Sequence, residues 1–320
     1  MKSPVLFIIF KRTETTKQVF ERIRDVRPPR LYVAADGPRH NRPDEVEACE
    51  KTRKIVEYVD WPCQVYTLFQ NQNLGCGRGV VAALSWFFSK EEEGIILEDD
   101  ILPHADFFIY CDEMLDKFRN DESIQMICGH NLFYNGIDHT SSYYMSSFMQ
   151  IWGWASWRRV WKTYEFDTNK LNAHLLENKL KERLPKKSVQ FFMEALRLMN
   201  SYEIDTWDYQ MFFNQILYDR YSILSYVNQT YNVGFGSLDS AHTTGENAIE
   251  SAHEVHSPYP IIHPNSFVED KSADNVNMIN SHQYIKSFQH LMLMRFKHKT
   301  KQYLKKLRIY DVLYKLRSRI

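Results

Sequence analysis

The sequence has little cysteine, and its cysteines are not arranged for cross-linking. Five cysteines occur in 320 residues, and no two of them have CxxC spacing. An odd number of cysteines without paired spacing argues against a disulfide framework and against a zinc site. The sequence therefore predicts free, buried thiols and a reducing compartment.

Long hydrophobic runs are also missing. No stretch approaches the ~18 consecutive apolar residues that a membrane-spanning helix needs. The apolar stretch from Val5 to Phe10 meets Lys11 and Arg12 at once, so it is too short for a signal peptide. We expect neither a spanning helix nor a secretory leader, and we expect the protein in the cytoplasm.

The chain has no overall excess of charge, because 40 Lys and Arg residues balance 40 Asp and Glu residues. The charges are unevenly placed, since residues 291–320 contain ten bases and one acid. Residues 1–290 are therefore acidic, which argues against nucleic acid as a partner. A basic tail on an acidic body predicts that the tail has a partner of its own.

Strand and helix patterns alternate over the first 130 residues. Apolar runs bounded by turn residues indicate buried strands, and apolar residues at helical spacing indicate the helices between them. This alternation predicts βαβ units and a parallel sheet. The expected strands are 4–10, 31–35, 64–69, 94–97, 124–128 and 222–227. The expected helices are 13–26 with Thr13 as N-cap, 44–58, one ending near 90, 107–119, most of 171–202 and one opening at 205–210; we expect little regular structure over 245–282.

Three acids, Glu98, Asp99 and Asp100, directly follow one of these buried strands. Ligands in open α/β sheets bind just outside the carboxyl ends of the strands. Adjacent carboxylates repel one another, so they need a compensating positive charge. A divalent cation held by oxygen ligands is the usual form of compensation. The alternative interpretation is an ordinary acidic turn.

Two further segments are open to more than one interpretation. Gly75, Gly77 and Gly79 precede a helix and could expose backbone amides to a phosphate, but the dinucleotide fingerprint GxGxxG is incomplete. A flexible turn explains these glycines equally well. Four tryptophans, at 152, 154, 157 and 161, surround Gly153 and are typical of either a sugar-binding loop or a buried aromatic cluster.

Seven segments, in order, resemble a family of bacterial glycosyltransferases with the GT-A fold. They cover roughly residues 3–246 and read FKRTETT, LYVAADGPR, NLGCGRGV, GIILEDDILPHADFF, IWGWASWRRVW, DTWDYQ and NVGFGSLDSAHTTG. The EDD segment is also similar to that of the N-acetylglucosaminyltransferase that acts on the mannose core of N-glycans. The resemblance implies an α/β fold with a mostly parallel central sheet flanked by helices. It implies a catalytic domain over residues 1–290, followed by a basic C-terminal helix over residues 291–320.

The resemblance also implies roles for individual residues. Asp100 and His242 are the expected metal ligands, and Asp208 is the expected catalytic base, with Asp205 in reserve. Contacts to the nucleotide sugar are expected from Asp36, Arg12, Arg39, Glu98, Asp99, Gly153 and Trp154. Three alternatives remain open: Asp208 as a helix cap, Asp36 as part of an Asp-Gly turn, and His242 as an ordinary loop histidine.

The implied activity is metal-dependent, inverting transfer of a hexosyl or N-acetylhexosaminyl group. The donor is a nucleotide-diphosphate sugar, with a UDP-sugar expected, and the acceptor is a glycan or lipid-linked glycan in surface polysaccharide or lipopolysaccharide synthesis. Mn²⁺ or Mg²⁺ would stabilise charge on the leaving diphosphate, and a carboxylate would take the acceptor proton.

Two other functions compete with this one. A sugar nucleotidyltransferase should have a glycine-rich basic loop after the first strand, where this chain has Lys11, Arg12, Thr13 and Glu14. A non-catalytic sugar-nucleotide-binding protein at the membrane surface would not need Asp100, Asp208 and His242 together.

The basic tail has its own pattern. Apolar residues recur at helical spacing among its ten Lys and Arg residues, at Tyr303, Leu304, Leu307, Tyr310, Leu313 and Tyr314. A basic amphipathic helix can lie in the interface of an anionic membrane. We therefore expect peripheral attachment to the inner face of the cell membrane, with packing of the apolar stripe on the catalytic domain as the alternative.

Overall fold

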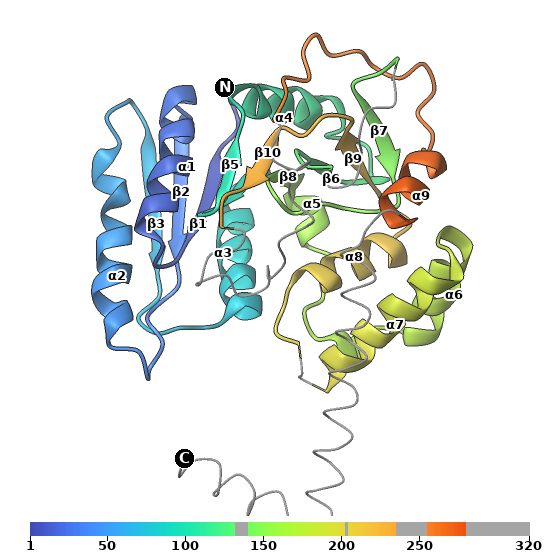
Figure 1. The fold of residues 1–320 in the computed structure, drawn as a ribbon, viewed down its shortest axis with the longest axis horizontal. Coiled ribbons are helices and arrows are strands. Elements are labelled where there is room, and N and C mark those ends of the chain that lie inside the picture. The colour runs from blue at the N-terminus through green and yellow to red at the C-terminus, as the bar shows by residue number, and fades with distance from the viewer. Residues whose placement is uncertain (132–139, 202–203, 235–254, 280–320) are drawn as a thin grey trace, which may run out of the picture.

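The computed structural model describes residues 1–131, 140–201, 204–234 and 255–279. Within these residues, helices flank a large mixed sheet whose strand order is β3-β2-β1-β4-β8-β6-β9-β7 (Figure 1). The predicted α/β class is therefore confirmed. His242 and the predicted basic helix of residues 291–320 lie outside the described residues.

The first half of the sheet is parallel, as predicted. β1, β2 and β3 are each followed by a helix, and β2 and β3 lie on one side of β1, whereas β4 lies on the other. β1, β2 and β4 are apolar and buried because helices cover them, whereas β3, at the edge of the sheet, is partly exposed. The elements are β1 (Val5–Ile9), α1 (Thr13–Val26), β2 (Arg30–Ala35), α2 (Asp44–Arg53), the 3₁₀ helix η1 (Lys54–Tyr58), β3 (Gln64–Phe69), α3 (Cys76–Lys90) and β4 (Glu93–Glu98).

The strand order reverses between β1 and β4. Chain connections leave β1 and β4 toward opposite sides of the sheet at this point, so their carboxyl ends open a crevice. The acid triplet begins with the last residue of β4, as the sequence predicts. The fold thus places Glu98, Asp99 and Asp100 at the switch point of the sheet.

The second half of the sheet is mixed, which corrects the expectation of a mostly parallel sheet. β8 runs antiparallel to both β4 and β6, and β7 runs antiparallel to β9. Residues 154–157, which we interpreted as part of a possible ligand loop, form the central strand β8 because their side chains are buried. The strands are β6 (Ile124–Cys128), β7 (Tyr143–Ser146), β8 (Trp154–Trp157) and β9 (Tyr221–Ser225); β5 (Ile101–Pro103) and β10 (Thr230–Asn232) form a separate antiparallel pair.

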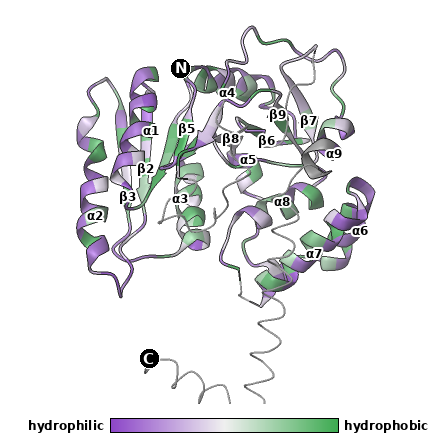
Figure 2. Ribbon diagram, viewed as in Figure 1, coloured by the Kyte–Doolittle hydropathy of each residue, from purple (hydrophilic) through white to green (hydrophobic). Residues whose placement is uncertain are grey.

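The remaining helices build a second apolar cluster beside the sheet. α6, α7 and α8 bury Leu180, Phe192 and Phe213 among themselves. In Figure 2 hydrophobic colour is prominent on α3, whereas hydrophilic colour dominates α2. This agrees with the burial of α3 residues such as Leu84 and Phe87 in the main core. The helices are α4 (Ala105–Lys117), α5 (Arg158–Trp161), η2 (Thr168–Lys170), α6 (Ala173–Arg183), α7 (Lys186–Asn200), α8 (Asp208–Leu217) and α9 (Lys271–Ile279).

Two predicted helix ends and one segment predicted to be irregular were wrong. Thr13 is not the N-cap of α1, since its hydroxyl pairs with that of Thr52 at 2.9 Å and Arg12 holds the cap position. The helix expected over 44–58 ends at Arg53 and continues as the 3₁₀ helix η1. Finally, α9 lies in a segment expected to be irregular.

No helix in the described ranges combines the length and the apolar character that crossing a membrane would require.

Candidate functional site

The acid triplet is held against the chain that leaves β1. Arg12 Nη1 lies 2.5 Å from Asp100 Oδ2 and 3.3 Å from Asp99 Oδ1. The amide of Phe10 donates to Asp99 Oδ2 at 3.0 Å. The structure therefore brings Arg12, expected to contact the nucleotide, directly onto the acids expected to bind metal and ribose.

Negative charge outweighs positive charge in this crevice. Burial raises the pKa values of Glu98 and Asp99 well above those of ordinary carboxyl groups, and the charge of Asp100 raises both further. The guanidinium of Arg12 opposes both shifts. Three acidic groups near one guanidinium leave an excess of negative charge, which a bound cation would neutralise.

The donor set fits a hard divalent cation. Carboxylate oxygens suit Mg²⁺ and Mn²⁺, which commonly take one or two protein carboxylates and complete their shell with water and substrate phosphate. Within the described ranges no group of three His, Cys, Asp or Glu side chains converges closely enough to hold a metal by itself. A cation at Asp100 would therefore need phosphate oxygens or ligands from residues outside these ranges.

The chain after β10 passes directly over Asp100. The amide of Val233 donates to the Asp100 carbonyl at 2.8 Å, and a Cβ at Gly234 would lie only 2.5 Å from Asp100 Oδ2. Glycine at 234 is therefore required by this close approach. His242 follows eight residues later, outside the described residues, so its role as a metal ligand stays a prediction.

Asp36 organises the loop that precedes α3. Its carboxylate accepts hydrogen bonds from the amides of Gly37 at 2.8 Å, Leu74 at 2.9 Å and Gly75 at 3.3 Å, and from Asn73 Nδ2 at 2.9 Å. Burial raises the pKa of Asp36 despite these bonds. Asp36 thus does more than form an Asp-Gly turn, and its contact with a nucleotide base stays a prediction.

Arg39 lies farther along the same edge of the sheet and is paired. Its Nε lies 2.9 Å from Glu45 Oε1, and Lys11 Nζ approaches the same oxygen at 3.2 Å. These bonds, that from Arg39 foremost, lower the pKa of Glu45 to about 2. Arg39 therefore fixes the start of α2 in this structure, and its contact with a nucleotide stays a prediction.

Asp208 is the first residue of α8, and it does not cap that helix. The cap position belongs to Trp207, and no side chain makes a capping hydrogen bond. Instead, the Asp208 carboxylate accepts a hydrogen bond from the Thr206 hydroxyl. The charge of Asp208 raises the pKa of Glu98, so both carboxylates lie in one electrostatic environment. The fold thus brings Asp208 within electrostatic range of Glu98.

Gly153 and Trp154 are closely packed against neighbouring elements of the core. Gly153 has φ +75°, and a Cβ there would lie 2.7 Å from Thr230 Cγ2. The Trp154 side chain is only 1% exposed and stacks on Trp207, with ring centroids 5.7 Å apart. A contact with the donor sugar stays a prediction and would involve Gly153 or backbone atoms rather than the buried ring. Of the four tryptophans, Trp154 and Trp157 belong to the core.

Two residues near Asp208 were missed or misjudged from the sequence. Tyr164 donates from its hydroxyl to the Trp207 carbonyl at 3.0 Å, and no motif in the sequence singles it out. Cys76 is exposed at the start of α3. Although the residue is exposed as a whole, its thiol is largely shielded from water, and this shielding together with the charges of Glu98, Asp208, Asp205 and Asp36 raises its pKa to about 12. In the sequence, only the positions of those acids at strand ends and helix starts indicated that Cys76 lies among negative charges.

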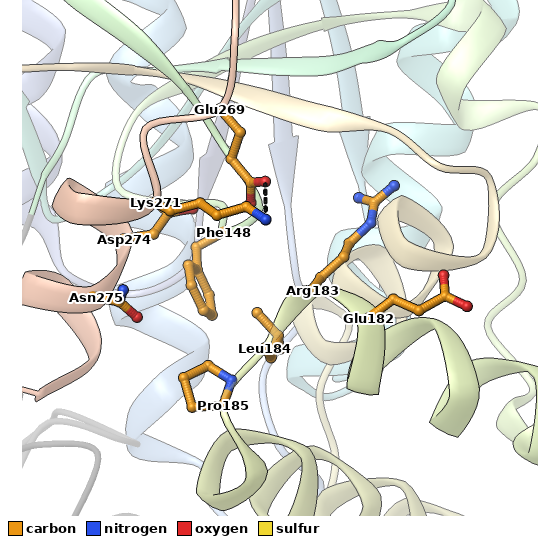
Figure 3. Close-up of a pocket in the computed structure, with 9 residues that line it drawn as sticks. All are labelled: Phe148, Glu182, Arg183, Leu184, Pro185, Glu269, Lys271, Asp274 and Asn275. Carbon is orange, nitrogen blue, oxygen red and sulfur yellow. Dashed lines mark ion pairs between the residues drawn. The ribbon is translucent and has the colours of Figure 1, made fainter.

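A separate hollow of about 210 Å³ lies between the α6–α7 junction and α9 (Figure 3). It contains none of the residues predicted for the site. Its lining combines apolar and charged side chains from Phe148, Glu182, Arg183, Leu184, Pro185, Glu269, Lys271, Asp274 and Asn275.

A scan against protein-family models found no match, and a search of curated proteins found none either. Solved structures show weak similarity. A mannosyltransferase from Pyrobaculum calidifontis, in complex with GDP-mannose and Mn²⁺, is 10% identical with a TM-score of 0.36, covering 68% of this chain and 70% of that chain. An apo UDP-glucose pyrophosphorylase is 11% identical with a TM-score of 0.37, covering 72% and 93%. Mouse xyloside xylosyltransferase 1 is 11% identical with a TM-score of 0.31, covering 68% and 81%. Since these TM-scores lie below 0.5, the similarity carries no weight for function.

Proposed function

We propose that this protein is a glycosyltransferase that moves a sugar from a nucleotide-diphosphate donor to an acceptor hydroxyl. The observation that supports this most is that acids from two distant parts of the chain, the triplet at the switch point of the sheet and Asp208, influence each other electrostatically. Glu98, Asp99 and Asp100 arrive from β4, and Asp208 arrives from the start of α8. One group suits a cation and phosphates, and the other suits a proton transfer.

The donor diphosphate would lie beside Asp100 and Arg12. A Mn²⁺ or Mg²⁺ ion bound there, with His242 as a further ligand, would stabilise negative charge on the diphosphate. Arg12 supplies a second positive charge and can pair with phosphate oxygens in a forked geometry. Asp36 and Arg39, farther along the same edge, would contact the nucleoside of a UDP-sugar.

Asp208 is the proposed general base. Its carboxylate takes the proton of the acceptor hydroxyl while the acceptor oxygen forms a bond to the anomeric carbon. The bond from that carbon to the diphosphate oxygen breaks, and the diphosphate leaves with the electron pair. Attack opposite to the leaving group inverts the anomeric centre, and such a base contributes typically ~10²–10⁴-fold.

The transferred group is proposed to be hexosyl or N-acetylhexosaminyl. The acceptor is proposed to be a glycan or lipid-linked glycan of a surface polysaccharide or lipopolysaccharide. Residues 291–320 would attach the protein to the inner face of the cell membrane, where such an acceptor is available.

Incubation with Mn²⁺ and a panel of nucleotide sugars tests this proposal. Slow release of a nucleoside diphosphate, by transfer to water, is the expected result for one donor. Formation of pyrophosphate from a nucleoside triphosphate and a sugar phosphate would instead identify a nucleotidyltransferase. Tight binding of a nucleotide sugar with no release, even after cell-derived glycolipid is added, would identify a non-catalytic binding protein.

A further inference from the structure

We propose that Asp205 is a positioning residue that ties the segment carrying Asp208 to the glycine loop, defined here as residues 73–77. This inference rests on the proposed function, in which Asp208 is the base. It assigns Asp205 a structural contact in the site rather than a share in proton transfer.

The contact is direct and sterically selective. Asp205 Oδ1 accepts a hydrogen bond from the amide of Gly77 at 3.2 Å. A Cβ at Gly75 would lie 2.6 Å from Asp205 Oδ2, and a Cβ at Gly77 would lie 2.6 Å from Oδ1. Gly75 also has φ +85°, and a Cβ at Gly77 would lie 2.9 Å from the Thr206 carbonyl, so both positions favour glycine where the carboxylate approaches the loop.

A second carboxylate, that of Asp36 after β2, holds the same loop. Asp36 accepts from the amides of Leu74 and Gly75, whereas Asp205 accepts from that of Gly77. Asp36 comes from the end of β2, and Asp205 lies 128 residues beyond Gly77 along the chain. The glycine loop thus joins the parallel half of the sheet to the segment that precedes α8.

The path from Asp205 to Asp208 is also fixed. The Trp207 ring stacks on Trp154 of β8, and the Trp207 carbonyl accepts from the Tyr164 hydroxyl at 3.0 Å. The Thr206 hydroxyl donates to the Asp208 carboxylate. With both ends of this four-residue segment held, a shift at Asp205 would move Asp208 relative to the donor.

Two substitutions separate positioning from catalysis. Asp205→Asn keeps a carbonyl oxygen that can accept from Gly77, and it removes the carboxylate. Asp205→Ala removes both. If Asp205 is a positioning residue, kcat for donor turnover should stay within about threefold of the wild-type value in the Asn variant. It should fall about 10²-fold in the Ala variant, because small misplacements of catalytic groups have effects of this order. If Asp205 were a base, both variants would lose activity equally, which would overturn the proposal.

The thiol of Cys76 gives a readout that does not depend on turnover. Cys76 lies between the two glycines, and its thiol is shielded while the loop is held, so its rate of alkylation by a neutral maleimide at alkaline pH reports on loosening of the loop. Both variants remove the same charge, so any difference between them comes from the hydrogen bond. Faster labelling in Asp205→Ala than in Asp205→Asn is the expected result, with Cys76→Ser as the blank and Asp25→Ala, an exposed acid on α1, as the matched control.

The outcomes are distinguishable from failure of the proposed function. Equal labelling rates in the two variants would overturn the contact, whatever the activity. Different labelling with equal kcat would overturn the positioning of Asp208. If no donor is turned over, the proposed function fails, whereas a labelling difference would still support the tie between Asp205 and the loop. Asp205→Glu, whose carboxylate is displaced by one methylene group from the Gly77 amide, should resemble the Ala variant and replaces it if that variant unfolds.

Discussion

At the residue scale, the charge balance of the site depends on Arg12. Its guanidinium is the cation that Asp99 and Asp100 share, and its side chain is 22% exposed. Removing one partner of a mostly buried ion pair leaves the other uncompensated.

We therefore expect Arg12→Ala to lower the free energy of unfolding by about 2 kcal/mol, below the value for a fully buried pair because this one is partly solvated. Millimolar Mn²⁺, added with a nucleoside diphosphate that supplies phosphate ligands, should restore more stability in the variant than it adds to the wild type, since a divalent cation can replace the lost charge. Denaturant unfolding with and without Mn²⁺ checks this. Arg42→Ala, which removes a solvent-exposed pair with Asp44, is the control and should change little. Failure of Mn²⁺ to restore any stability would show that the acids do not bind a cation.

Asp208 is the residue on which turnover depends. Asp208→Asn removes a proton acceptor and little volume, so we expect kcat to fall by about 10²–10⁴-fold while donor binding is retained. Steady-state kinetics and calorimetric titration of the donor measure the two quantities separately. Asp219→Asn, beyond the other end of α8, is a matched control. A variant with weakened donor binding and normal kcat would make Asp208 a donor ligand instead of a base.

At the element scale, α9 is attached to the sheet through a buried carboxylate. Asp274 accepts from the Ser146 hydroxyl at 2.5 Å and from the Ser147 amide at 2.9 Å, and it lines the hollow of Figure 3. Burial raises the pKa of Asp274 to about 7. A carboxyl group whose pKa is raised by folding stabilises the protein below its unfolded pKa, and this contribution is lost as the pH rises toward the folded pKa.

Asp274→Asn should therefore remove part of the pH dependence of stability. Between pH 4 and pH 7 the wild type should lose up to about 1.4 kcal/mol per pH unit relative to the variant, with no further loss above pH 7. Denaturant unfolding of both proteins at pH 4.5, 6 and 7.5 measures this difference. Parallel stability curves for the two proteins would mean that Asp274 keeps an ordinary pKa.

Some of these elements were predictable from the sequence, and others were not. β1, β2, β3 and β4 were predictable because each is a short run of mainly apolar residues bounded by turn residues. α1 was predictable from the helical spacing of its apolar residues. β8 was not, because four residues rich in tryptophan and following a glycine fit a loop as well as a buried strand. α9 was missed because its segment is polar. Its start is marked by Asp270, whose carboxylate accepts from the amides of Ser272 and Ala273, but a single such residue did not outweigh that polarity.

The site was predictable in part for a physical reason. Carboxyl ends of parallel strands meet at one edge of a sheet, which predicts that residues after β1, β2 and β4 lie close together. The pairing of Arg12 with Asp100 joins residues 88 apart, and the contact of Asp205 with Gly77 joins residues 128 apart. Neither follows from local spacing, because both depend on how distant elements pack.

At the scale of the whole molecule, the basic residues 291–320 predict attachment to an anionic membrane. Each cation near such a surface contributes ~1 kcal/mol, so even half of the ten would bind the protein firmly. Full-length protein should float with anionic liposomes at low salt and be released at high salt. A version ending at His290 should stay unbound and keep activity on a soluble acceptor. Unfolding of the shortened protein, or indifference of the full chain to anionic vesicles, would make the tail a structural part of the catalytic domain.

The central claim is that the carboxylates at the switch point support metal-dependent sugar transfer. The most direct test is Mn²⁺-dependent release of nucleoside diphosphate from a nucleotide sugar, measured side by side for wild type and Asp100→Ala. The account predicts release by the wild type that a chelator abolishes, and no release by the variant, whose thermal unfolding stays close to that of the wild type. Equal release by both proteins, or full activity of the variant in the presence of chelator, would contradict it.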